Sequence, residues 1–98
     1  MPKPLWKLHI IKNQLKGSET TYTVTRHPAN QEALDGAVNP QTSPQSWGRL
    51  SSVLGQIARA DPSKLAALKQ ELALKGSAEL FDVPLDSFDL RLIGFTDA

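Results

Sequence analysis

SPQSWGRLSSVLGQIARA (residues 43–60) and DPSKLAALKQELALKG (residues 61–76) form the stretch that best indicates the fold, because the local signals in both segments favour helix. Apolar residues recur in each segment at spacings of three and four, which places them on one stripe of a helix. The stripes consist of Trp47, Leu50, Leu54 and Ile57 in the first segment and of Leu65, Leu68 and Leu72 in the second. We therefore predict two consecutive amphipathic helices.

The expected ends of these helices carry residue types that usually cap them. Ser43 precedes Pro44, and Asp61 precedes Pro62. Each polar side chain can accept from the free backbone N–H groups of a first turn, and proline is favoured at the first helical position. Gly76 follows the second segment, as a left-handed terminating residue does. The helices are thus predicted to begin near residues 44 and 62.

Two segments that precede the helices predict a β-hairpin. Residues 5–12 (LWKLHIIK) and 19–26 (ETTYTVTR) alternate in the manner of strands, and the turn between them contains Gly17. One face of this hairpin would carry the apolar residues Trp6, Leu8, Ile10, Tyr22 and Val24. Because an isolated hairpin is marginally stable, we expect the helices to pack against this face.

The C-terminal region predicts a third strand. Residues 88–95 (FDLRLIGF) alternate, so one face of this strand would add to the core the residues Phe88, Leu90 and Leu92. Residues 77–81 predict one further helical turn, which Pro84 would end.

These elements define an α+β fold in a single domain, residues 1–98. We predict a three-stranded sheet, made of the hairpin plus the C-terminal strand, with a two-helix layer packed on one face. The order is ββ(α)ααβ, where the bracketed helix is a short one expected within residues 29–35. The C-terminal strand should lie beside the first, since separate strands would leave unpaired edges. Its direction stays open; a parallel arrangement would make the helical segment a right-handed crossover.

The composition excludes several classes of protein. The chain contains no cysteine, which excludes a disulfide scaffold, a thiolate nucleophile and a Cys-ligated metal. No segment approaches the roughly 18 to 20 apolar residues of a membrane span, and the N-terminal region has no apolar run of signal-peptide length. We expect a cytoplasmic protein without a membrane partner.

The net charge of +1 is unevenly distributed along the chain. Residues 1–30 contain five Lys or Arg residues and one acidic residue, whereas residues 61–98 contain four basic and seven acidic residues. Such an asymmetry can mark a binding face. It can equally mean that the two ends of the chain lie side by side and neutralise each other.

Catalytic and metal-binding patterns are missing from the sequence. The two imidazoles, His9 and His27, stand apart from any nucleophile motif, the glycines form no phosphate-binding loop, and the acidic residues lack the spacing of a calcium loop. We therefore expect a protein that is not an enzyme and that holds no cofactor and no metal ion.

Protein binding is the function that these features favour. The sheet face away from the helices should expose four apolar residues, which we take as candidate interface residues: Leu5, Ile11, Ile93 and Phe95. A three-stranded sheet also has two edges to which a partner or a second copy can add a strand. We predict a small protein-interaction domain, such as an adaptor, inhibitor or regulatory subunit, with a homodimer as one form of that interaction.

The alternative function is binding to nucleic acid through the basic hairpin. The candidate contacts are Lys7, Lys12, Lys16 and Arg26, with the hydroxyls of the neighbouring threonines as further phosphate donors. The sequence pI of about 8.1 is low for such a role. The two hypotheses predict different surfaces, one apolar and one basic.

Overall fold

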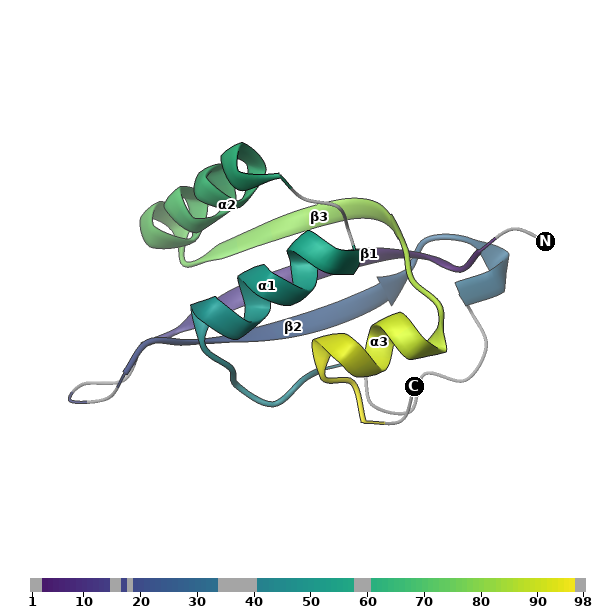
Figure 1. The fold of residues 1–98 in the computed structure, drawn as a ribbon, viewed down its shortest axis with the longest axis horizontal. Helices are drawn as coiled ribbons and strands as arrows, with labels where there is room; N and C mark the ends of the chain where they lie inside the picture. The colour runs from purple at the N-terminus through teal and green to yellow at the C-terminus, as the bar shows by residue number, and fades with distance from the viewer. Residues whose placement is uncertain (1–2, 15–16, 18, 34–40, 58–60, 97–98) are drawn as a thin grey trace.

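A three-stranded antiparallel sheet with helices on one of its faces forms the fold (Figure 1). The structure is a computed structural model, which describes residues 3–14, 17, 19–33, 41–57 and 61–96. The elements are, in order, β1 (Leu5–Asn13), β2 (Thr21–Pro28), the 3-10 helix η1 (Gln31–Ala33), α1 (Trp47–Ile57), α2 (Pro62–Lys75), β3 (Ser77–Pro84) and α3 (Ser87–Ile93). The predicted α+β class and the three-stranded sheet are confirmed.

Strand β1 occupies the centre of the sheet, whose order is β2-β1-β3. The last strand of the sheet lies beside the first, as predicted, and runs antiparallel to it, so no crossover connection is needed. Along β1 the side chains of Trp6, Leu8 and Ile10 are buried, and the intervening ones are partly exposed. This period-two pattern shows that the helices cover one face of the sheet.

The predicted position of the third strand was wrong. The strand is β3, residues 77–84, and not residues 88–95. Residues 77–81 were predicted as a helical turn, yet SAELF alternates in the same way as a strand, and Ala78 is buried against β1. Gly76 turns the chain directly from α2 back onto β1, whose second edge needs a partner.

Residues predicted to form the third strand instead make the short helix α3. Asp86 begins this helix with a capping box: its side chain accepts from the backbone N–H of Asp89, whose side chain accepts from the N–H of Asp86. Leu90 and Ile93 are buried at a helical spacing of three, whereas Phe88 is exposed. A seven-residue segment with four apolar residues fits either period, and the cap selects the helix.

The ends of the two longer helices test the predicted start signals. Helix α2 begins as predicted, with Asp61 as its cap and Pro62 in the first turn, and it ends at Gly76 in the left-handed conformation. Helix α1 begins at Trp47, three residues later than predicted. The delay has a physical cause, because the backbone of Gln45 exchanges two hydrogen bonds with Tyr22 at the edge of β2.

The bracketed short helix is confirmed in part. η1 falls inside the predicted residues 29–35, and residues 34 and 35 lie outside the described part of the chain. The side chain of Asn30 holds this segment against the sheet by accepting from the backbone N–H groups of Leu5 at 3.0 Å and Ala33 at 3.1 Å.

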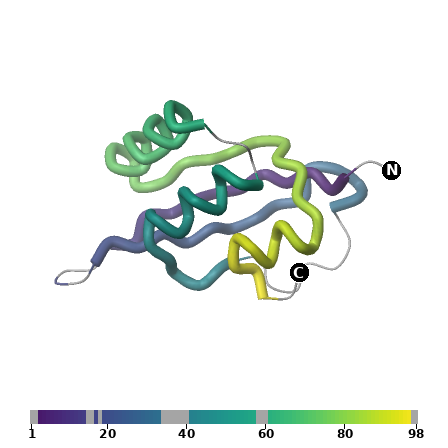
Figure 2. Tube along the Cα trace, viewed as in Figure 1, coloured from purple at the N-terminus to yellow at the C-terminus, as the bar shows by residue number. Residues whose placement is uncertain are grey.

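One core lies between the sheet and the helices, whose arrangement Figure 2 traces along the Cα atoms. The five predicted hairpin residues are buried in it, together with Leu50, Leu54, Leu68 and Leu72 from the helical stripes. Val83, Leu85 and Phe95 join this core although no prediction placed them there. The indole N–H of Trp6 donates to the carbonyl of Leu85 at 3.1 Å, which fixes the segment between β3 and α3. None of the helices in the described ranges is long and apolar enough to cross a membrane.

A first prediction concerns the turn between α2 and β3. Gly76 has φ of 79°, so Gly76→Ala should lower the free energy of unfolding by about 1 kcal/mol through backbone strain, although a Cβ there would meet no atom within 4 Å. Gly48→Ala is the matched control, because Gly48 lies in α1 with equally open surroundings, and the same change should stabilise by up to about 1 kcal/mol. Unfolding in urea measures both free energies. An equal loss of stability at the two positions would contradict the left-handed conformation of Gly76.

A second prediction concerns the cap of α3. The backbone N–H of Asp89 donates to the Asp86 carboxylate at 2.9 Å, and this bond, helped by the charge of Lys3 and opposed by desolvation, lowers the pKa of Asp86 below its ordinary 3.8. Because the folded pKa is the lower one, the cap stabilises the fold above the unfolded pKa and this contribution is lost as pH falls through the folded pKa.

Unfolding in urea at a series of pH values, with the wild type and Asp86→Asn side by side, tests the cap. Wild type should be the more stable at pH 6, and the difference should shrink below about pH 4. A difference that stays constant from pH 6 to pH 3 would contradict this role of the carboxylate.

Candidate protein-interaction surface

The face of the sheet opposite the helices is open and mostly polar. Its side chains are half-buried or exposed, in contrast to the buried face. The alternation and the register place on it Lys7, His9, Ile11 and Asn13 from β1, Thr21, Thr23, Thr25 and His27 from β2, and Ser77, Glu79 and Phe81 from β3. This open face is one part of the candidate surface.

The four predicted interface residues divide into two groups. Leu5 and Ile11 are half-buried, and Ile11 lies on the open face as predicted. Ile93 and Phe95 are 0% and 1% exposed, so their predicted exposure on the sheet was wrong. They are buried because residues 87–93 form a helix that packs against α1, and Phe95 follows it into the core.

The three candidate nucleic-acid contacts that the structure describes are not gathered on one surface. Arg26 is buried, and its guanidinium lies 5.0 Å from the centre of the Trp6 ring and 4.6 Å from that of Phe95. Lys7 forms an ion pair with Glu79 at 3.2 Å. Lys12 is half-buried on β1, and Lys16 lies outside the described residues. The parity of β2 already indicates the place of Arg26, since it has the same parity as the buried Tyr22 and Val24.

Ion pairs join the basic N-terminal part of the chain to the acidic C-terminal part. Lys7 pairs with Glu79 across neighbouring strands, and Lys3 lies 3.8 Å from the carboxylate of Asp89. These pairs support one of the two explanations of the charge asymmetry, namely that the two ends of the chain lie side by side and neutralise each other. The side chains of these pairs are partly exposed to solvent, so the pairs contribute little stability.

One edge of the sheet, that of β2, is covered by the segment that leads into α1. The backbone of Gln45 exchanges hydrogen bonds of 2.8 and 2.9 Å with Tyr22, and the N–H of Thr42 donates to the carbonyl of Val24 at 2.9 Å. The hydroxyl of Thr42 also accepts from the N–H of Val24 at 3.0 Å. These bonds satisfy the outward-facing backbone groups of β2, so this edge is closed to a further strand along residues 22–24.

The other edge, that of β3, is open in the part of the chain that the structure describes. Lys12 donates its N–H to the carbonyl of Gly76 at 2.9 Å, and the register then continues through Ile11 opposite Ser77 and His9 opposite Glu79. In an antiparallel pair, hydrogen-bonded and non-bonded pairs alternate. The N–H and C=O groups of Ser77 and Glu79 therefore point away from β1, toward the side on which the described residues place no strand.

A β-bulge ends the regular part of this open edge. Leu8 is opposite Leu80 and Trp6 is opposite Val83, so two residues of β3 face the single residue Lys7. Asp82 in the bulge has φ of 52°, a conformation that aspartate tolerates better than most residues. Phe81 is 67% exposed beside it. The bulge thus presents an aromatic ring at the side of an unpaired strand.

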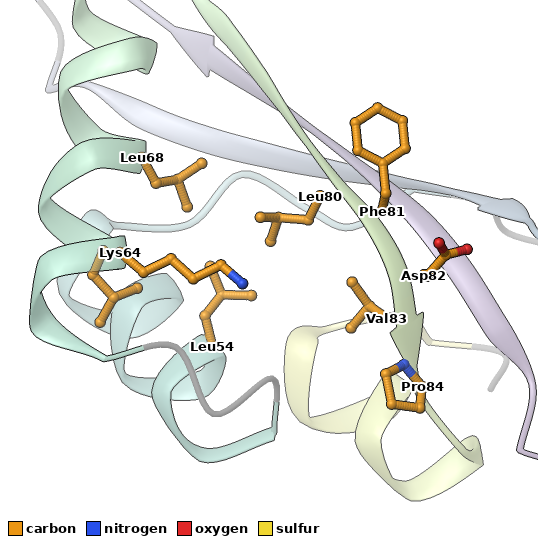
Figure 3. A pocket seen from close by; sticks show the side chains of 9 residues that line it. Leu54, Lys64, Leu68, Leu80, Phe81, Asp82, Val83 and Pro84 are labelled. Atoms are coloured by element: carbon orange, nitrogen blue, oxygen red, sulfur yellow. The ribbon is translucent and has the colours of Figure 1, made fainter.

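A pocket of about 130 Å³ lies between β3 and α2, directly beside the open edge (Figure 3). Its lining is mostly apolar: Leu54 of α1, Leu65 and Leu68 of α2, and Leu80, Val83 and Pro84 of β3, with Phe81 and Asp82 of the bulge and Lys64. Figure 3 shows Leu80 and Val83 directed toward α2 and the Lys64 side chain extending from α2 toward β3. The open edge of β3, Phe81 and this pocket together are called the β3 surface below.

The sequence-based predictions missed the elements that form the β3 surface. The alternation of SAELF is a signal for β3, but the sequence analysis predicts a helical turn there, with Pro84 as its end. The bulge and the juxtaposition of Lys64 with Leu80 carry no sequence signal, because they depend on how β3 packs beside α2. Within the described ranges, no three His, Asp or Glu side chains gather as metal ligands would.

Comparisons of this chain with family models, with curated proteins and with solved structures gave no match. Its function has to be inferred from its own residues.

A third prediction concerns Arg26, which was a candidate nucleic-acid contact. Because its planar guanidinium lies within 5.0 Å of both the Trp6 and the Phe95 rings, Arg26→Lys should lower the free energy of unfolding by roughly 1 to 3 kcal/mol even though the charge is kept. Lys12→Arg is the reverse charge-conserving change, at a half-buried residue of the neighbouring strand β1. Its free energy of unfolding should stay within about 0.5 kcal/mol of the wild-type value. Urea unfolding compares the two, and an Arg26→Lys protein as stable as wild type would contradict a structural role for the guanidinium.

Proposed function

We propose that this chain is a small non-enzymatic protein-interaction domain that binds another protein through the β3 surface. The observation that carries the proposal is the difference between the two edges of the sheet: residues 41–45 occupy the edge of β2, whereas Ser77 and Glu79 direct their backbone groups away from the sheet. An unpaired edge strand invites pairing with another chain unless it is blocked. An adaptor, inhibitor or regulatory subunit would use such a surface.

The exposed aromatic residue beside this edge gives further support. Phe81 is 67% exposed, and large aromatic side chains are enriched among the residues that dominate binding energy in interfaces. Ile11, a predicted interface residue on the neighbouring open face, lies opposite Ser77. It adds apolar surface on β1, next to this edge.

Binding to nucleic acid through the hairpin has weaker support. Of its four candidate contacts, Arg26 is buried between aromatic rings and Lys7 is paired with Glu79. Phosphate contacts require accessible cations, so the described residues offer no basic stripe along β1 and β2 for a nucleic-acid backbone.

The fourth prediction tests the proposed function by affinity capture from a native cell extract. Phe81→Asp should abolish recovery of a stoichiometric partner, since loss of a central aromatic contact costs about 2 kcal/mol or more in binding. Leu74→Asp is the matched control, because Leu74 is 78% exposed on α2 and its replacement should leave recovery unchanged.

Size-exclusion chromatography with light scattering completes this test. If the partner is a second copy, wild type should be a dimer that Phe81→Asp converts to a monomer. A monomeric wild type that recovers no partner, or equal effects of Phe81→Asp and Leu74→Asp, would contradict binding through the β3 surface.

A further inference from the structure

We infer that the β3 surface binds an extended segment of another protein as an added strand, with an aliphatic side chain of that segment in the pocket and an acidic side chain beside Lys64. This inference rests on the proposed function and specifies the chemistry of the partner.

The open edge of β3 offers hydrogen bonds in the spacing that a strand requires. The outward N–H and C=O groups belong to Ser77 and Glu79, two residues apart on the same side of the strand. An extended peptide that adds to such an edge gains main-chain hydrogen bonds, which provide affinity with little dependence on sequence. The bulge at Phe81 and Asp82 limits regular pairing to residues 77–80.

The pocket supplies the specificity that backbone pairing lacks. Side chains of an added strand would alternate between the open face and the helix side of the sheet. Those on the helix side would enter the space between Leu80 and Leu68, where the pocket volume is about 130 Å³. An apolar cavity of about 150 Å³ accommodates a molecule the size of benzene, so this pocket suits one leucine, isoleucine or valine side chain.

The electrostatics of the pocket favour a partner with an acidic residue next to the aliphatic one. Lys64 extends from α2 toward β3 at the pocket, and it takes part in none of the ion pairs found among the described residues. Asp82 also lines the pocket, but its side chain projects from β3 on the side away from α2 and from Lys64 (Figure 3). A carboxylate on the added segment would complement this ammonium group.

Strand β3 of a second copy does not provide the required segment. If β3 of another molecule paired with this edge, the side chains on the helix side would be Ala78 and Leu80 of that molecule. Ala78 is buried in the molecule's own core, and Leu80 lines its own pocket against α2. Neither can also enter a neighbour's pocket, so the occupant has to be a segment that is free on both of its faces.

The fifth prediction uses a display library of random 12-residue peptides, panned against the full-length chain. The selected peptides should share an aliphatic residue with Asp or Glu within two positions. Their affinities, measured by fluorescence anisotropy, should fall about tenfold or more in Glu79→Pro relative to Glu79→Ala. Both variants lose the ion pair with Lys7, but only proline removes the outward N–H, and edge strands tolerate proline at such positions.

Two further measurements keep the test independent of the folding of the proline variant. N-methylation of successive amides in a selected peptide should weaken binding at every second position, which is the signature of a strand paired along one edge. Panning against Lys64→Glu should enrich Lys or Arg in place of the acidic residue, whereas panning against Lys69→Glu, a change on the same helix, should keep the acidic preference.

The possible results separate this inference from the proposed function. Recovery of no binding peptide, N-methylation effects without a period of two, or equal affinities for Glu79→Pro and Glu79→Ala would overturn strand addition. The proposed function would stand in each of these cases if Phe81→Asp still abolished capture of a partner. A wild-type dimer that Glu79→Pro converts to a monomer would assign the edge to a second copy and would also overturn the inference.

Discussion

The backbone of β1 needs hydrogen-bond partners on both of its sides, because its side chains at Trp6, Leu8 and Ile10 lie in the core and water cannot reach that face. The hairpin provides β2 on one side. On the other side the chain has to return from α2, and Gly76 in the left-handed conformation makes this return in a single residue. The position of β3 beside β1 follows from this requirement.

The two outer edges of the sheet differ in whether another segment of the described chain pairs with them. Residues 41–45 pair with β2, and this pairing delays the start of α1 until Trp47. The side chain of Gln45 donates in turn to the carbonyl of Ile93 at 3.1 Å at the end of α3, so the segment that closes the edge also holds the C-terminal helix. At β3 a bulge ends the regular edge, and the described residues place no strand against the backbone before it.

Tertiary packing, and not spacing along the chain, decides which charged side chains are buried, paired or exposed. Arg26 lies in the core because the aromatic rings of Trp6 and Phe95 flank its guanidinium, a contact that joins β1, β2 and the C-terminal segment. Lys7 and Glu79 neutralise each other on the open face. As a result, the described residues of the hairpin do not form a basic surface. Lys64 on α2 lies beside an apolar pocket.

The sequence alone determined the elements whose signals are local and periodic: the hairpin and its buried face, the stripes of both helices, and the caps of α2 at Asp61 and Gly76. It could not distinguish strand from helix at residues 77–81 and 88–95, because short apolar segments fit both periods and the choice depends on which edge lacks a partner and which cap can form. Only the tertiary structure placed Ile93 and Phe95 in the core and left the outward backbone groups of Ser77 and Glu79 without a strand partner among the described residues. Burial and edge pairing are relations between distant parts of the chain, and the pattern within one segment does not contain them.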